Sequence, residues 1–249
     1  MFSFNLNEFR QNFPILYSKN NGNNLVYLDN AAITQVPKCV IESLTNYYSN
    51  FNANIHRSAY YLSELATEKY EQVRKNINIF FNGDDPNNFI FLRSTTEAIN
   101  LVAHSYLRQI LKSGDEILIS QMEHHSNIVP WYILCKELNV SLKVIPILFD
   151  GSIDYSKIDS LLTSKTKILS ITHISNSLGT INDIKRIISF AHSKNVPVLI
   201  DGAQSFSNCK IDLNDLNCDF YVFSSHKMHG PNGLGFLYAK KKFLEFMSP

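Results

Sequence analysis

An aspartate and a lysine each follow a short apolar run, at positions where they could take part in acid–base or covalent chemistry. Asp201 comes directly after Val196–Ile200, and Lys227 comes soon after Asp219–Phe223. A carboxylate at the end of a buried strand costs free energy unless a cation or hydrogen-bond donors meet it. A desolvated lysine loses its proton more readily and becomes a nucleophile. The simplest alternative is an ion pair between the two side chains at the mouth of a sheet.

Three further polar segments also follow predicted strands. Ser94–Thr96 opens a stretch with helical spacing, so its hydroxyls and free backbone N–H groups could bind a phosphate, although a plain helix cap explains them too. Glu123–His125 brings two imidazoles, and Asn176 brings an amide. A metal site at His124 would need further ligands that the sequence does not supply, and a buried, hydrogen-bonded histidine is the other alternative.

These groups together match one kind of ligand, a pyridine aldehyde that carries a phosphate. The aldehyde needs an amine such as Lys227, and the ring nitrogen needs a carboxylate such as Asp201. An imidazole can stack on the ring, amides can bind its oxygen, and the residues at 94–96 can bind the phosphate.

The elements that must position these groups alternate along the chain. Helical spacing is predicted for 62–80, 94–111, 128–138 and 181–193, and Ser94 with Glu97 predicts a capping box. The strand candidates are Phe89–Leu92, Glu116–Ser120, Leu142–Ile147, Lys167–Ser175, Val196–Ile200, Asp219–Phe223 and Gly233–Ala239. This alternation predicts an α/β fold, a mostly parallel seven-stranded sheet with helices on both faces. In such sheets, ligands bind beyond the carboxyl ends of the strands.

Composition narrows the class of protein. The chain has 249 residues, 45% of them hydrophobic, and Lys+Arg 23 nearly balances Asp+Glu 22. We therefore expect neither a nucleic acid nor a membrane as a partner. No signal peptide is evident and no stretch approaches the ~18 apolar residues that span a bilayer, so a cytoplasmic location is expected. The four cysteines form no C-x-x-C pair, which favours a reducing compartment and ordinary core or surface roles.

Six short motifs are spread along the chain in a fixed order: Tyr27–Ala32, His56-Arg57, Thr95–Ala103, Glu123–Trp131, Asp201–Gln204 and His226-Lys227. Together they resemble the cysteine desulfurases of the iron–sulfur-assembly type, within the class V aminotransferase group of fold type I enzymes that use pyridoxal phosphate. The resemblance extends from about Phe13 to the last residue.

The resemblance implies a role for each matching residue. Lys227 would hold pyridoxal phosphate as a Schiff base and move protons, Asp201 would keep the ring nitrogen protonated, and His124 would stack on the ring. Gln204 would bind the phenolic oxygen, and Asn176 would approach the substrate carboxylate or that oxygen. The implied phosphate ligands are Thr95, Thr96, Ser224 and His226, and the implied substrate neighbours are His56 and Arg57, which could reach a second subunit.

The implied reaction takes sulfur from L-cysteine, leaves L-alanine, and passes a persulfide to an acceptor protein for iron–sulfur cluster assembly. A homodimer is also implied. Residues 1–30 would belong to a small domain and residues 31–249 to the large cofactor-binding domain. The rest of the small domain, with its nucleophilic cysteine and its carboxylate-binding arginine, has no counterpart, and none of the four cysteines matches that nucleophile.

Two positions depart from the family pattern, because Ser94 and Ser225 stand where glycine is usual. We expect a modest effect on the phosphate loop. Two alternative functions stay open: a selenocysteine lyase or another class V lyase, and a non-catalytic remnant that only folds and pairs.

Overall fold

A computed structural model describes residues 4–248 of the chain. These residues divide into two compact units, one made of residues 4–77 and 225–232 and the other of residues 78–224 and 233–248. The predicted division at residue 30 stays a prediction. Within residues 4–248, no helix is long and apolar enough to cross a membrane.

The first unit consists of helices, a small hairpin and one inserted loop. Its elements are α1 (Leu6–Arg10), η1 (Pro14–Tyr17), β1 (Lys19–Asn20), β2 (Asn23–Asn24), α2 (Lys38–Asn50), α3 (Tyr61–Phe80, up to Ile77 in this unit) and η5 (Ser225–Lys227). Asn21 and Gly22 form the tip of the β1–β2 hairpin, where they take left-handed backbone angles, φ 51° and 81°.

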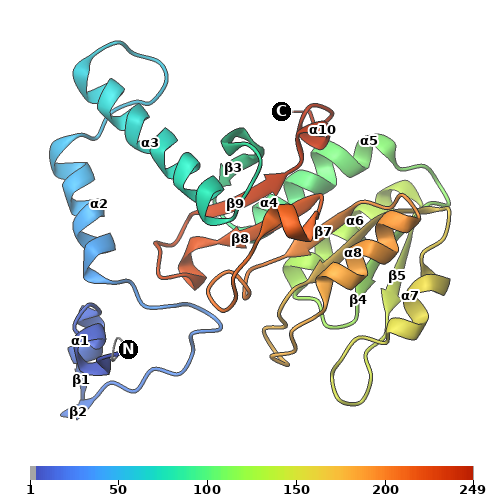
Figure 1. The fold of residues 1–249 in the computed structure, drawn as a ribbon, viewed down its shortest axis with the longest axis horizontal. Helices are drawn as coiled ribbons and strands as arrows, with labels where there is room; N and C mark the ends of the chain where they lie inside the picture. Colours follow the sequence, from blue (N-terminus) through green and yellow to red (C-terminus); the bar gives the residue numbers. More distant parts are fainter. Residues whose placement is uncertain (1–3, 249) are drawn as a thin grey trace. The chain divides into compact units, whose positions relative to one another are not determined.

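The second unit is built on a seven-stranded sheet. In chain order the strands are β3 (Phe89–Leu92), β4 (Glu116–Ser120), β5 (Ser141–Ile145), β6 (Thr166–Thr172), β7 (Val198–Asp201), β8 (Phe220–Ser224) and β9 (Gly235–Ala239). Across the sheet they lie in the order β3-β9-β8-β7-β6-β4-β5. Figure 1 shows the strands of this sheet as arrows. Strands β5, β4, β6, β7 and β8 pair in parallel, and only β9 forms antiparallel pairs, with β3 and β8. The predicted α/β fold with a mostly parallel sheet is confirmed.

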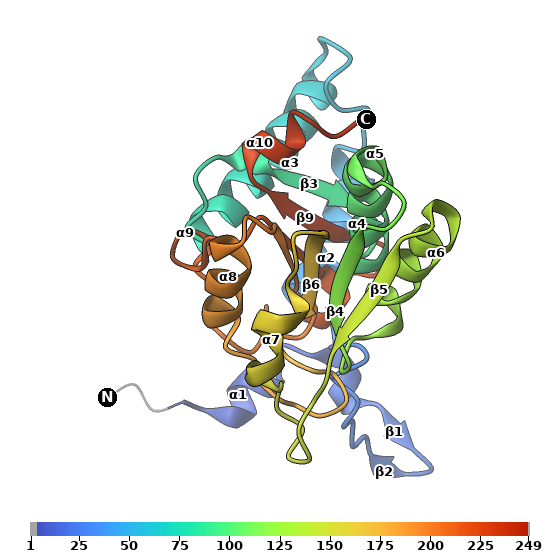
Figure 2. The ribbon, with the colours of Figure 1, turned by 90° about the vertical axis from the view of Figure 1, so that its right-hand side faces the viewer.

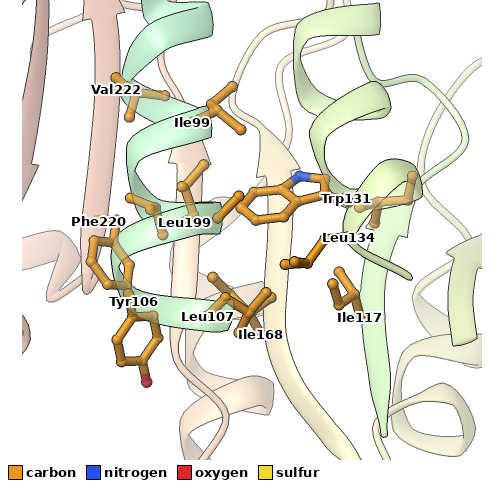
Figure 3. Close-up of a cluster of buried hydrophobic side chains, with 14 of the residues drawn as sticks. Ile99, Tyr106, Leu107, Ile117, Trp131, Leu134, Ile168, Leu199, Phe220 and Val222 are labelled. Atoms are coloured by element: carbon orange, nitrogen blue, oxygen red, sulfur yellow. The ribbon is translucent and has the colours of Figure 1, made fainter. Parts of the chain in front are cut away.

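Helices cover both faces of this sheet, as predicted. Figure 2 shows α8 (Ile184–Ser193) on one side of the strands and α4 (Thr95–Leu101), α5 (Arg108–Ile110) and α6 (Val129–Leu138) on the other. The main core lies under α4, α5 and α6, where Trp131 packs among aliphatic side chains of the strands (Figure 3). The short elements are η2 (Pro86–Asn88), η3 (Val102–Leu107), η4 (His125–Asn127), α7 (Tyr155–Leu161), α9 (Leu213–Leu216) and α10 (Lys241–Leu244).

Several predicted boundaries were wrong by a few residues, for reasons that concern the backbone. Pro146 and Pro197 have no N–H for a ladder, so β5 ends at Ile145 and β7 begins at Val198. Gly233 has φ 81° and lies in a turn, so β9 begins only at Gly235. Strand β6 ends at Thr172, and α8 begins at Ile184 after the capping residue Asp183.

The helix expected at 94–111 is present from Thr95 to Ile110, but its middle, η3, is π-helical. The capping box is half formed. The Ser94 Oγ accepts from the Glu97 N–H at 3.1 Å. The Glu97 carboxylate, however, binds the N–H and guanidinium of Arg93 rather than the Ser94 N–H, because the cation is in reach.

Gly235 is required where β9 meets the start of α4. A Cβ built there would lie 2.4–2.6 Å from backbone atoms of Ser94. We therefore expect Gly235→Ala to lower the free energy of unfolding by about 3 kcal/mol, since the main chain must shift to admit the methyl group. Urea denaturation measures the loss, with Ser141→Ala on the edge strand β5 as the control. A loss below about 0.5 kcal/mol, typical of a neutral surface change, would contradict this close packing.

Candidate cofactor site

Six strands of the second unit end at one edge of the sheet. β4, β5, β6, β7 and β8 are parallel, and β3 runs in the same direction as β8 because both pair antiparallel with β9. The candidate residues that follow or end these strands therefore gather along that edge, as predicted. They are Thr95 and Thr96 after β3, His124 after β4, Asn176 after β6, Asp201 and Gln204 at the end of β7, and Ser224 at the end of β8.

Asp201 is the buried acid of this edge, with only 3% of its surface exposed. It ends β7, between Thr172 of β6 and Val222 of β8. Its Oδ1 accepts a hydrogen bond from the Ala203 N–H at 3.0 Å, which shapes the turn that leads to Gln204. Gln204 is also buried, so a carboxylate and an amide are presented from one short turn.

The side chains of Tyr221, Ser205 and His173 contact one another at that turn. The Tyr221 hydroxyl lies 2.6 Å from Ser205 Oγ and 3.2 Å from His173 Nδ1. The Tyr221 ring passes so close to Gly202 that a Cβ there would lie 2.1 Å from it. Burial lowers the pKa of His173 to about 4, so this imidazole is neutral at pH 7. His173, whose N–H donates to the Asp201 carbonyl, therefore adds no positive charge near Asp201.

His124 lies at the surface, which corrects the alternative of a buried histidine. Its Nδ1 accepts from the Ser126 N–H at 3.2 Å and lies 2.7 Å from Ser126 Oγ. Since a backbone N–H can only donate, Nδ1 carries the lone pair and the ring proton of the neutral form is on Nε2. Asn176 is likewise exposed, in a turn that the Ile174–Ile181 bridge closes.

Thr95 offers an unused donor at the start of α4. Its side chain is buried, and within the described residues its Oγ1 has no hydrogen-bond partner. Its N–H and that of Thr96 are in the first turn, where a helix supplies no acceptor. Ser224 is buried at the end of β8, and both Leu92 of β3 and Ser224 pair with Gly235. These donors suit a phosphate.

The first unit contains the other candidate residues. His226 and Lys227 lie on the turn η5, three residues or fewer past Ser224 along the chain. The His226 carbonyl accepts from the N–H and hydroxyl of Thr34 at 2.8 and 3.0 Å, which ties the turn to its own unit. Burial, and secondarily the charge of Lys227, lower the pKa of His226.

His56 and Arg57 are exposed residues of the same unit. His56 has φ 61°, its Nε2 lies 2.9 Å from Glu71 Oε1, and its N–H donates to Thr67 Oγ1. The helix α3 therefore holds this histidine through two contacts.

Both serines that depart from the family pattern direct their hydroxyls into their own loops. Ser94 caps α4, and Ser225 Oγ donates to the Pro231 carbonyl. The structure thus gives each side chain a local partner.

The four cysteines are free thiols, two exposed or half-exposed and two buried. Burial raises the pKa of Cys135 to about 11 and that of Cys218 to about 12, and it also raises the pKa of Cys209. These three are therefore poor sources of thiolate.

Sequence reasoning missed a buried polar cluster around Glu123, the residue that precedes His124. It joins Glu123 to Ser120, Asn127 and Thr172, and it extends from Asn127 to Trp131 and Ser170. The available signal was a serine and a threonine, Ser170 and Thr172, in the part of β6 that is buried on both faces.

The chain is similar in sequence to proteins named cysteine desulfurase. A probable cysteine desulfurase of Halalkalibacterium halodurans is 48% identical over 98% of this chain, and a cysteine desulfurase of Escherichia coli is 45% identical over 99%. The chain spans 60–61% of the length of these two relatives.

Solved structures agree with the fold. The cysteine desulfurase CsdA of Escherichia coli gives a TM-score of 0.89 at 38% identity, over 99% of this chain and 61% of that one. The apo cysteine desulfurase of Thermococcus onnurineus gives 0.91 at 32% identity, over 100% and 60%. Residues 26–249 also match the family described as aminotransferase class V. The chain belongs to the class V aminotransferase family.

Proposed function

We propose that this chain binds pyridoxal phosphate and acts as the cofactor-binding part of a cysteine desulfurase. Such an enzyme takes sulfur from L-cysteine and leaves L-alanine. The observation that carries the proposal is the buried Asp201 at the end of β7, next to the parallel strand β8 that leads within three residues to Lys227. The relatives named cysteine desulfurase, 45–48% identical over nearly the whole chain, support the same function.

The residues at the sheet edge fit the proposed cofactor. A phosphate would give the buried Thr95 hydroxyl the acceptor that it lacks within the described residues. Thr96, Ser224 and His226 are the further proposed phosphate ligands, and the first-turn N–H groups of α4 add to them. The absence of a Cβ at residue 235 lets the main chain of Ser94 approach β9 closely.

When bound, pyridoxal phosphate supplies an electron sink for a carbanion at the α-carbon of an amino acid. In the proposed site the Asp201 carboxylate would accept a hydrogen bond from the ring nitrogen and hold a proton there. Gln204 would donate to the phenolic oxygen, and His124 would lie against the ring and offer its Nε2–H. Lys227 would hold the cofactor and move a proton to or from the substrate.

The substrate and partners belong to the same proposal. Asn176 is proposed to contact the carboxylate of L-cysteine or the phenolic oxygen of the ring, and His56 and Arg57 are proposed as further neighbours of the substrate. The sulfur would pass as a persulfide to an acceptor protein for iron–sulfur cluster assembly. Pairing of two copies, a cytoplasmic location, and the absence of nucleic-acid and membrane partners complete the proposal.

Lys227→Ala tests the covalent attachment. We expect the wild-type chain to take up pyridoxal phosphate and develop its lysine-bound visible absorbance, and the variant to lose this absorbance, because no other amine is proposed to attack the aldehyde. Borohydride reduction followed by peptide mass spectrometry should place the cofactor on the peptide that contains Lys227. The control is Lys210→Ala, an exposed lysine of the second unit. Label on a different lysine would contradict the assignment.

The choice of substrate is tested on the cofactor-loaded chain. L-cysteine should change the visible absorbance in a saturable way, because the amino acid must replace Lys227 to react. L-serine at the same concentration should change it much less, since the proposed site is for a thiol substrate. Equal responses to the two amino acids would argue against a cysteine-specific enzyme.

Thr95→Val removes the buried hydroxyl while keeping the shape of the side chain. We expect cofactor affinity to fall by about 10- to 100-fold, the value of a hydrogen bond to a charged group. Without cofactor the variant should be as stable as wild type or more so, because a buried hydroxyl with no described partner is removed. Equilibrium titration and thermal unfolding measure the two effects, with Thr45→Val on α2 as the control. Unchanged affinity would remove Thr95 from the phosphate site.

A further inference from the structure

The carboxylate of Glu123 joins three elements behind the proposed site. Its Oε1 accepts from Ser120 Oγ at the end of β4 and from the Thr172 N–H at the end of β6, the latter at 3.0 Å. Its Oε2 accepts from Asn127 Nδ2 at 2.5 Å, just before α6. Glu123 is 8% exposed, so these contacts replace solvent.

The direction of the hydrogen bonds in this cluster is fixed by Trp131. An indole N–H can only donate, and it donates to Asn127 Oδ1 at 2.9 Å, an atom that also accepts from Ser170 Oγ at 2.5 Å. The amide of Asn127 must therefore turn its Nδ2 toward Glu123. It follows that residue 123 has to accept at this position.

We infer that Glu123 is a positioning residue for the proposed cofactor site, where it holds the segment that bears His124 against strand β6. The inference rests on the proposed function. His124 directly follows Glu123, and Thr172, which Glu123 binds, is the ladder partner of Asp201. Glu123 thus fixes the position of two parts of the proposed site. One is the segment that bears His124, which is proposed to stack on the ring. The other is the end of β6, which lies beside Asp201, the residue proposed to bind the ring nitrogen.

Burial raises the pKa of Glu123 to about 8, although the donated hydrogen bonds from Ser120, Thr172 and Asn127 act in the opposite direction. Among the described residues, Asp201 of β7 is the charged group that acts on it, and its negative charge also raises this pKa. Because the ordinary value is 4.5, the folded state holds this proton more tightly than the unfolded chain. The stability that it contributes is lost as pH rises through about 8.

Two variants can show whether the hydrogen bonds between residues 123 and 127 matter, or only which side chains stand at these positions. In Glu123→Gln an amide NH₂ faces the NH₂ of Asn127, and a flip of Asn127 would break its bonds to Trp131 and Ser170. In Glu123→Gln with Asn127→Asp, the glutamine donates to an aspartate that still accepts from Trp131 and Ser170. The double variant thus restores every contact and moves the acidic side chain to residue 127.

The first readout needs no cofactor. Trp131 is the only tryptophan in the chain, so its indole N–H resonance reports on this cluster alone. We expect this resonance to be displaced in Glu123→Gln and to return toward the wild-type position in the double variant. In the wild type it should titrate with a midpoint near pH 8, and in Glu123→Gln this transition should be absent. An unchanged resonance in Glu123→Gln would overturn the inference.

The second readout is cofactor affinity. Glu123→Gln should weaken binding by about tenfold, the effect of one lost buried hydrogen bond, and the double variant should regain all but about threefold. Ile187→Ala on α8, a core truncation on the other face of the sheet, controls for lost stability and should keep wild-type affinity. If the wild type binds cofactor and Glu123→Gln binds it equally well, the role of Glu123 is refuted while the proposed function stands. If the wild type binds none, the proposed function itself fails.

Discussion

The structure depends on the burial of two carboxylates, Asp201 and Glu123, at one edge of a sheet. A buried charge is tolerated only where hydrogen-bond donors or a cation meet it. Glu123 meets donors from Ser120, Asn127 and Thr172, and Asp201 accepts a hydrogen bond from the Ala203 N–H in the turn that follows it. The negative charge of Asp201 raises the pKa of Glu123, so a protonated ring nitrogen beside Asp201 would suit the site electrostatically.

The sheet brings these groups together through its strand order. The antiparallel β9 lies between β3 and β8 and lets β3 run in the same direction as the parallel strands. The start of α4 therefore reaches the same edge as the end of β8. Gly235 permits the close approach that this arrangement needs, because any side chain there would meet the main chain of Ser94.

The fold and the row of strand-end residues could be predicted from the sequence, because both follow from local signals. Alternating apolar runs gave the seven strands, and polar residues directly after those runs gave Asp201, His124 and Thr95. Partners that are distant in the chain could not be predicted. Glu123 and the Thr172 N–H are 49 residues apart, and Asn127 and Ser170 are 43 apart, so no local pattern pairs them.

The central claim is that Asp201 keeps the ring nitrogen of bound pyridoxal phosphate protonated. Nuclear magnetic resonance of cofactor labelled with nitrogen-15 in the ring measures this directly. The account predicts the shift of a protonated pyridine in the wild-type chain and the shift of a neutral pyridine in Asp201→Ala. A neutral nitrogen in the wild type, or a protonated one in both proteins, would contradict it.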